Sequence, residues 1–223
     1  MTSINHHKSA LRQTFAPLVP KRLLEARGVF FRLGDAGPTY AKLCLLDTIG
    51  IRKFMRRSAS ADARSFLFVC YGNIMRSPMA ELMLKSALSE YHEAGITVLS
   101  AGIHATPGTE AHPQARVAAR ELGMPLDWHR SKLLTEDMVT NADAVFAMDF
   151  QNLAELLTRF PQSRNKIFML SAYGEGAQRG RPIADPYFGD QEQTSRCYAE
   201  LQICVTNLAN CLRAFINRGS SNE

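Results

Sequence analysis

The amino-acid sequence predicts an α/β fold in which a four-stranded parallel sheet is flanked by helices. Short apolar segments of strand-like composition alternate with longer helix-compatible segments between residues 66 and 217. A strand followed by a helix and then by another strand needs a crossover connection, and such crossovers place neighbouring strands parallel. The four expected strands are residues 66–69, 96–99, 144–147 and 167–170.

The expected helices lie between and after these strands. They cover residues 78–91, 113–122, 150–159 and 190–217. In the first of them, Met79, Leu82, Met83 and Ala87 recur at the spacing of one helix face. Parallel sheets bind their ligands at the carboxyl ends of the strands, and Cys70 follows the first expected strand at that edge.

Composition indicates a globular protein with one domain of ordinary size plus an appendage. The chain has 223 residues, of which 46% are hydrophobic and 21% are charged, as is typical of soluble domains. It contains neither an apolar run long enough to span a membrane nor the apolar core of a secretory signal. Five cysteines without a compact disulfide framework favour a reducing compartment. We therefore expect a cytoplasmic protein, although the Arg-rich, acid-poor N-terminus also fits an organelle transit peptide.

The positive charge of the chain is concentrated in its first 65 residues. They hold 12 Lys and Arg against 4 Asp and Glu, whereas the remaining residues hold 14 against 17. A small polar stretch at residues 56–65 predicts a boundary between a basic N-terminal extension, residues 1–65, and a second unit, residues 66–223. Two helices are expected in the extension, at residues 21–33 and 40–57.

Three destinations are open for this extension, because it mixes basic with apolar residues. Its apolar residues include Phe30, Phe31, Leu43, Leu45 and Leu46. Such a segment can pack on the acidic remainder of the chain, on an anionic membrane surface, or on a partner protein. We expect no nucleic-acid partner.

The connection between the first strand and the first helix predicts an anion-binding loop. Its backbone N–H groups can converge next to the positive end of the helix macrodipole. Gly72 and Asn73 are residue types that tolerate the left-handed dihedral angles of a tight loop, and Arg76 offers a planar fork to two phosphate oxygens. The expected phosphate-binding residues are Tyr71, Gly72, Asn73, Ile74, Met75, Arg76 and Ser77.

Cys70 is the expected nucleophile of this loop. A helix N-terminus and a nearby guanidinium both stabilise the thiolate form of a cysteine. A thiolate beside bound phosphate can attack phosphorus and form a phosphocysteine, which water later cleaves. The chain lacks the Gly-Lys-Ser/Thr ending of nucleotide-binding loops. We expect neither a metal nor a cofactor for this chemistry.

These residues resemble the signature of the low-molecular-weight protein tyrosine phosphatases, over about residues 66–215. Further motifs match in the order of the family: Ser100-Ala101-Gly102, His129 after Leu122-Gly123-Met124-Pro125, Met148-Asp149 and Asp185-Pro186-Tyr187. Several motifs in one order make the resemblance specific. It leaves residues 1–65 unexplained.

The resemblance implies hydrolysis of phosphotyrosine in proteins, with Cys70, Arg76 and Asp185 as catalytic residues. Asp185 is the implied general acid, and it lies in a Gly- and Pro-containing stretch, residues 174–189, that can bring a carboxyl group over the phosphate. Ser77 is expected to donate a hydrogen bond to the sulfur of Cys70. The expected supporting network consists of Asn73, Ser77, Ser100 and His129.

Aromatic and apolar side chains are expected to hold the phenyl ring of the substrate by stacking. The expected substrate walls are Tyr71, Ile74, Thr106, Tyr187 and Phe188. The implied partner is a phosphotyrosine protein, and bacterial members of the family often act on tyrosine kinases of polysaccharide export.

Three alternatives remain open at the level of sequence. Arsenate reductases share the fold but need further cysteines to shuttle a disulfide, and none lies between Cys70 and Cys197. Arginine phosphatases have threonine where Ile74 stands, and apolar Ile74 favours a phosphotyrosine ring. A phosphate-binding module without turnover is the third alternative. The recurrence of Cys197, Cys204 and Cys211 every seven residues predicts core packing of the last helix.

Overall fold

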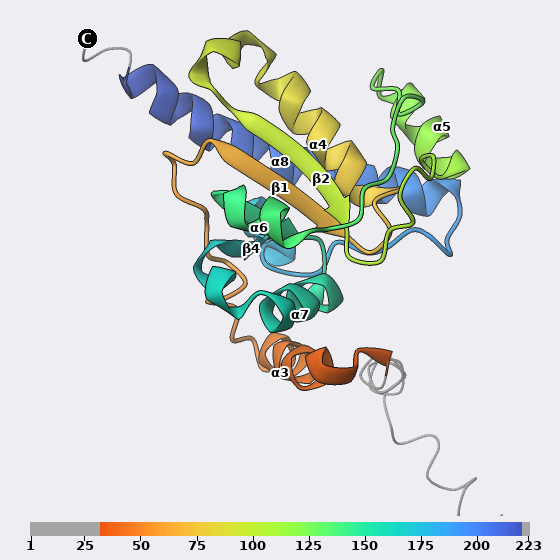
Figure 1. Cartoon of the computed structure of the whole chain (residues 1–223), viewed down its shortest axis with the longest axis vertical. Helices are drawn as coiled ribbons and strands as arrows, with labels where there is room; N and C mark the ends of the chain where they lie inside the picture. The colour runs from red at the N-terminus through yellow and green to blue at the C-terminus, as the bar shows by residue number, and fades with distance from the viewer. Residues whose placement is uncertain (1–31, 220–223) are drawn as a thin grey trace, which may run out of the picture.

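The computed structural model describes residues 32–219 and contains the expected parallel sheet between two helical layers (Figure 1). The strands are β1 (Ser65–Cys70), β2 (Thr97–Gly102), β3 (Ala144–Ala147) and β4 (Ile167–Met169). Their order in the sheet is β2-β1-β3-β4, and every neighbouring pair is parallel. The predicted fold class is therefore confirmed, with β2 reaching further toward its carboxyl end than the sequence suggested.

The register of β1 places Cys70 at the carboxyl edge of the sheet. Cys70 pairs with Gly102 at the end of β2, and Val69 pairs with Ala147 at the end of β3. Because all strands run in the same direction, the loops that follow β1, β2 and β3 meet at this edge.

Helices cover both faces of the sheet because β1 is apolar on both sides. Phe66, Phe68 and Cys70 face a core shared with α4 (Arg76–Ala87), α5 (Pro113–Glu121) and α8 (Gln191–Gly219). Leu67 and Val69 face a second core shared with α6 (Glu136–Asn141) and α7 (Phe150–Arg159). Strands buried on both faces read as continuous apolar runs, as residues 66–69 do.

Two helical predictions differ from the structure. The helix expected at residues 78–91 is α4, which starts at Arg76 and ends at Ala87; the 3-10 segment η2 (Ser89–Ala94) follows, with Tyr91 in a non-helical conformation. Helix α6 was not expected at all. Thr135 caps it by accepting a hydrogen bond from the N–H of Met138 at 3.3 Å, so a threonine followed by acidic residues was the available signal.

The cysteine prediction for α8 is confirmed at two of three positions. Cys197 and Cys204 lie in the core, whereas Cys211 is exposed. An α-helix drifts by about 20° for each seven residues, so a seven-residue repeat does not stay on one buried face.

The described part of the extension packs on the rest of the protein. After the 3-10 turn η1 (Gly34–Ala36), α3 (Gly37–Thr48) lies along α7, on the side away from the sheet (Figure 1). Ala36, Leu43 and Met55 share the core that contains Val69 and Phe150. Of the three destinations considered for the extension, packing on the domain is therefore confirmed for residues 33–57.

The helix expected at residues 40–57 is wrong in its second half. Helix α3 ends at Thr48, and Gly50 takes a left-handed φ of 77°, the usual way to terminate a helix. The helix expected at residues 21–33 falls almost entirely outside the described residues. The division of the chain at residue 65 stays a prediction.

Residues 49–64, between α3 and β1, form a linker that is fixed to the domain. The guanidinium of Arg57 donates to the carbonyl oxygens of Arg164, Asn165 and Ile167 and lies 5.2 Å from the centre of the Phe168 ring. Met55 is fully buried. Within residues 32–219, no helix is long and apolar enough to cross a membrane.

Substitution of Met55 tests whether the extension belongs to the cooperative fold. Met55→Ala should lower the free energy of unfolding by about 2–5 kcal/mol, because it leaves a cavity under the linker. Leu45→Ala is the control, since Leu45 on α3 is 60% exposed and its loss should cost no more than about 0.5 kcal/mol. Urea unfolding of the full chain measures both values. Equal midpoints for Met55→Ala and wild type would contradict the packing.

Candidate active site

The loop between β1 and α4, residues 71–75, crosses the end of β2 at very close range. A Cβ atom on Gly102 would lie 2.7 Å from both the backbone nitrogen of Asn73 and the carbonyl carbon of Gly72. Only glycine fits at this crossing. The loop is also tied to its neighbours through its backbone, since the N–H of His104 donates to Tyr71 and the N–H of His112 donates to Ile74.

Asn73 is the centre of the loop. It is fully buried and takes a left-handed φ of 54°, a conformation that asparagine tolerates better than most residues. Its side-chain Nδ2 donates to the hydroxyls of Ser77 and Ser100, at 2.8 and 2.9 Å. Its Oδ1 accepts from the backbone N–H of Lys132 at 2.8 Å. These bonds hold the left-handed turn in place.

The network around Asn73 extends to a buried carboxylate and a histidine. Ser100 donates to Glu81 at 2.6 Å, and Lys85 pairs with the same carboxylate at 2.6 Å. His129 donates through Nε2 to the carbonyl oxygen of Asn73 at 2.7 Å. Burial lowers the pKa of His129, while the bond to Asn73 opposes that shift, so the neutral, donating ring is favoured.

Two hydrogen bonds stabilise the sulfur of Cys70. The backbone N–H of Asn73 donates to Sγ at 3.2 Å, and the Ser77 hydroxyl lies 3.0 Å from Sγ. The Ser77 oxygen accepts from Asn73, and its proton can be donated to the sulfur or to the carbonyl oxygen of Ala101, which lies further away at 3.3 Å. Cys70 is buried at the end of β1, so these contacts replace solvent around a thiolate.

Arg76 is a fully buried cation, with 1% of its surface exposed. Its Nη1 donates to Asp149 at 2.6 Å and to the carbonyl oxygen of Ile183 at 3.0 Å. Its Nη2 donates to Asp185 at 2.5 Å. Burial acts to lower the pKa of Arg76, but the nearby Asp149, Asp185 and Cys70 more than offset it, so the net shift is upward.

The remaining donors of Arg76 form an open edge. A guanidinium has five N–H donors, and the contacts above use both hydrogens of Nη1 and one of Nη2. The Nε–H and the second Nη2 hydrogen remain. Two donors of one guanidinium can bind two oxygens of one phosphate.

Asp149 and Asp185 come from different elements but meet at Arg76. Asp149 caps α7 through Oδ1, which accepts from the N–H of Asn152 at 2.7 Å, and binds Arg76 through Oδ2. Asp185 accepts from the N–H of Tyr187 at 3.2 Å through its other oxygen. The loop at residues 174–189 therefore reaches the phosphate-binding loop through this carboxylate.

Aromatic rings lie on both sides of the loop. Tyr71 packs on His104 with ring centres 4.6 Å apart, and His104 in turn pairs with Glu155 at 2.6 Å. On the other side, Tyr187 lies 5.4 Å from His112 and 4.8 Å from Phe188. These rings come from the loops after β1 and β2 and from the loop that carries Asp185.

The other three residues predicted to form the substrate walls, Ile74, Phe188 and Thr106, differ in their surroundings. Ile74 is half-buried against the core below the loop. Phe188 is 96% exposed, so packing within the loop does not explain why an aromatic side chain stands at this position. The carbonyl oxygen of Thr106 accepts from Ser131 at 2.5 Å, whereas the ring that faces Tyr71 is that of His104. The role of Thr106 as a substrate wall stays a prediction.

Sequence reasoning did not assign roles to several residues of this site. Asp149 and Gly102 stood inside matched motifs, so their positions were visible but not their contacts. Glu81, His104 and Ile183 carried no signal, because their partners lie far away in the sequence. Among residues 32–219, no group of three or more His, Cys, Asp or Glu side chains is arranged to hold a metal ion.

A parallel sheet with a Cys-x5-Arg loop at its carboxyl edge defines a phosphate-binding α/β protein. The model of the low molecular weight phosphotyrosine protein phosphatase family matches residues 65–218. The chain belongs to this family of hydrolases.

Relatives in the family carry two kinds of name. A protein-arginine-phosphatase of Bacillus subtilis is 35% identical over 147 residues, which are 66% of this chain and 95% of that protein. A probable low molecular weight protein-tyrosine-phosphatase, EpsP of Ralstonia nicotianae, is 36% identical over 124 residues, 56% of this chain and 79% of that protein. The names of these relatives thus divide between arginine phosphatases and tyrosine phosphatases.

Solved structures repeat this division. The YwlE arginine phosphatase with a phosphorylated active-site serine superposes with a TM-score of 0.61 at 34% identity, covering 67% of this chain and 95% of that one. The tyrosine phosphatase AmsI of Erwinia amylovora gives 0.60 at 31% identity, covering 66% and 92%.

Two substitutions of Asn73 separate the strain of the loop from its hydrogen bonds. Asn73→Ala should lose both the side-chain network and the tolerance for a left-handed φ, which costs about 1–2 kcal/mol for an ordinary residue. Asn73→Gly should recover the second loss but not the first. We expect phosphate affinity in the order wild type, glycine variant, alanine variant, measured by calorimetric titration with inorganic phosphate. Equal affinity of all three proteins would show that Asn73 does not hold the loop.

Proposed function

We propose that this protein is a metal-independent protein tyrosine phosphatase that works through a phosphocysteine on Cys70. The carrying observation is the meeting of Cys70, Arg76 and Asp185 at the carboxyl edge of the sheet, with Arg76 binding Asp185 at 2.5 Å and Cys70 on the same loop. A non-catalytic phosphate-binding module has no need of a positioned carboxyl group. The presence of all three residues in one place favours turnover.

In the first proposed step the thiolate of Cys70 attacks the phosphorus of phosphotyrosine. The S–P bond forms as the P–O bond to the phenol breaks, and the carboxyl group of Asp185 gives its proton to the departing oxygen. The products are a tyrosine side chain and phosphocysteine.

In the second proposed step water attacks the phosphocysteine. Asp185, now a carboxylate, accepts a proton from the water, an oxygen–phosphorus bond forms and the S–P bond breaks. Inorganic phosphate leaves, and Cys70 departs as a thiolate stabilised by Ser77 and by the N–H of Asn73. The enzyme returns to its starting state without any redox change.

The phosphate is proposed to be held by Arg76 and by the amides of the loop. Among residues 32–219, the backbone N–H groups of Gly72, Ile74 and Met75 donate to no protein acceptor. They are therefore available to the equatorial oxygens, where negative charge accumulates in the transition state. Met75 is itself fixed by Tyr198, whose hydroxyl donates to its carbonyl oxygen at 3.2 Å.

Phosphotyrosine is favoured over phosphoarginine by the apolar surroundings of the site. Ile74 presents a hydrocarbon side chain in the loop, and Tyr71 and Tyr187 are each about half exposed beside it. These surfaces suit a phenyl ring, which gains from burial and stacking, more than a guanidinium. Hydrolysis of phosphoarginine is the second candidate, because arginine phosphatases are among the similar relatives.

A relay of the arsenate reductase type has little support. Burial raises the pKa of both Cys197 and Cys204 to about 12, and a protonated thiol is a poor nucleophile. The five cysteines are all unpaired, which supports a reducing, cytoplasmic location. We propose a phosphotyrosine protein as substrate, a bacterial tyrosine kinase being one candidate, and leave membrane or partner contact through residues 1–65 as a hypothesis.

Three variants test the chemistry on para-nitrophenyl phosphate without added metal. Cys70→Ser should reduce turnover below about 1% of wild type while keeping phosphate affinity, because the amides and Arg76 remain. Asp185→Asn should lower kcat/KM by about 10²–10⁴-fold for phenyl phosphate, which needs the acid most. Arg76→Ala should damage both KM and kcat. Substantial turnover by Cys70→Ser would end the proposal.

Specificity is tested by exchanging one side chain of the loop. Wild type should cleave a phosphotyrosine peptide with a kcat/KM at least about tenfold above that for a phosphoarginine peptide, since each matched apolar contact contributes about 1–3 kcal/mol. Ile74→Thr should narrow this ratio, whereas Ile74→Val keeps an apolar branched side chain and should leave it nearly unchanged. A wild-type preference for phosphoarginine would transfer the assignment to the second candidate.

A further inference from the structure

The stretch Met55–Ala59 of the linker touches the loop that carries Asp185. This acid loop, residues 174–189, follows the 3-10 segment η4 (Leu170–Tyr173). The linker contacts the acid loop at two places and the end of η4, directly before the acid loop, at a third. Each contact joins residues more than 100 positions apart in the sequence, so none of them follows from local structure.

The first contact is the close packing of Gly180 against the linker. Gly180 takes a left-handed φ of 79°, and a Cβ atom at this position would lie 2.8 Å from Cγ of Arg56 and 3.4 Å from the carbonyl oxygen of Met55. Atoms of the linker therefore occupy the space that a side chain at position 180 would fill. The N–H of Gly180 is bonded to the carbonyl oxygen of Ser171 at 2.8 Å, which fixes the turn.

The second contact is a hydrogen bond from Arg56 to the acid loop. Its Nε donates to the carbonyl oxygen of Arg179 at 3.2 Å. The side chain of Arg179 folds back, and its Nε donates to the carbonyl oxygen of Ala172 at 2.9 Å. Arg179 therefore receives a hydrogen bond from the linker and donates one to the segment that precedes the acid loop.

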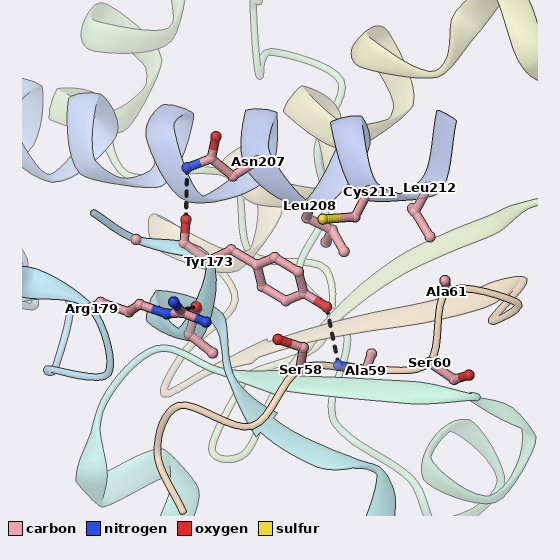
Figure 2. Close-up of a pocket in the computed structure, with 12 residues that line it drawn as sticks. Ser58, Ala59, Ser60, Ala61, Tyr173, Arg179, Asn207, Leu208, Cys211 and Leu212 are labelled. Atoms are coloured by element: carbon pink, nitrogen blue, oxygen red, sulfur yellow. Dashed lines mark hydrogen bonds between the residues drawn. The ribbon is translucent and has the colours of Figure 1, made fainter. Parts of the chain in front are cut away.

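The third contact fastens the base of the acid loop. The backbone N–H of Ala59 donates to the hydroxyl of Tyr173 at 3.0 Å, while Asn207 on α8 donates to the carbonyl oxygen of Tyr173 at 2.9 Å. Figure 2 shows the Tyr173 ring between the linker residues Ser58 and Ala59 and the helix that bears Asn207 and Leu208. These residues line a pocket of about 360 Å³.

The other end of the same segment is bonded to the active site. The N–H of Ile183 donates to the carbonyl oxygen of Met148 at 2.8 Å, and its own carbonyl accepts from Arg76. Asp185 follows two residues later. The chain from Arg179 to Asp185 is therefore held at one end by the linker and at the other by Arg76.

The linker lies outside the part of the chain that matches the family. The B. subtilis relative is covered over 95% of its length by 147 aligned residues, and the family match begins at residue 65. That relative has no room for a counterpart of residues 1–57. The contacts made by Met55 and Arg56 therefore have no counterpart in that relative.

We propose that the linker, through Arg56 and Ala59, positions the acid loop and thereby the carboxyl group of Asp185. Arg56 is a positioning residue in this scheme and touches neither substrate nor the reacting atoms. The inference rests on the proposed function, in which Asp185 protonates the leaving group. A misplaced acid slows the release of basic phenolates most, since acidic phenols leave without help.

The test compares kcat/KM for phenyl phosphate with that for para-nitrophenyl phosphate, whose leaving group is far more acidic. Full-length Arg56→Ala should raise the ratio of the nitrophenyl to the phenyl value by about fivefold, as a displaced catalytic group costs rate. Tyr173→Phe removes the acceptor for Ala59 and should raise the ratio in the same direction. Arg56→Lys keeps a cationic donor and should restore much of the wild-type ratio.

Arg57→Ala is the matched control, because Arg57 anchors the same linker to residues 164–167 and not to the acid loop. It should lower stability and leave the ratio unchanged, since a loss of folded protein reduces both rates equally. An unchanged ratio in both Arg56→Ala and Tyr173→Phe overturns the inference, as does an equal rise in Arg57→Ala. Wild type without phosphatase activity, or activity that survives Cys70→Ser, would instead defeat the proposed function itself.

Discussion

Burial of the Arg76 guanidinium is the constraint on which the rest of the site depends. An unpaired buried cation is costly, so its charge must be met by carboxylates and carbonyl oxygens. Asp149 and Asp185 supply the charge, and Ile183 supplies a neutral acceptor. These partners come from two segments, the start of α7 and the acid loop, residues 174–189. Fixing one side chain therefore fixes the N-terminus of α7 and the acid loop relative to the phosphate-binding loop.

The loop itself is held by a second set of contacts centred on Asn73. Asn73 takes a left-handed conformation, and its N–H donates to the sulfur of Cys70. The strain is offset by hydrogen bonds that Asn73 donates to Ser77 and Ser100 and accepts from Lys132 and His129. Gly102 allows the two chains to cross at contact distance. Protein contacts therefore hold the loop on several sides, as in a preorganised site.

The N-terminal extension packs on both of the segments that hold Arg76. Helix α3 packs on α7, whose first turn is capped by Asp149. The linker packs on the acid loop, which contains Asp185. Burial, Cys44 and the carboxylate of Asp149 raise the pKa of Tyr40 on α3, so the extension lies within electrostatic range of the carboxylate that holds Arg76. A segment without a counterpart in a shorter relative thus packs on the two elements that carry Asp149 and Asp185.

Local sequence patterns were enough to predict the parallel sheet, the position of Cys70 at its edge and the loop that follows it. These features are local: apolar runs set the strands, and Gly72, Asn73 and Pro78 limit the backbone between strand and helix. Only the tertiary structure decided which groups meet Arg76, because Asp149 and Asp185 lie 73 and 109 positions away. It also decided that residues 33–57 pack on the domain, where basic and apolar composition left three destinations open. Local patterns state what a segment can form, whereas the partner that buries it depends on the fold of the whole chain.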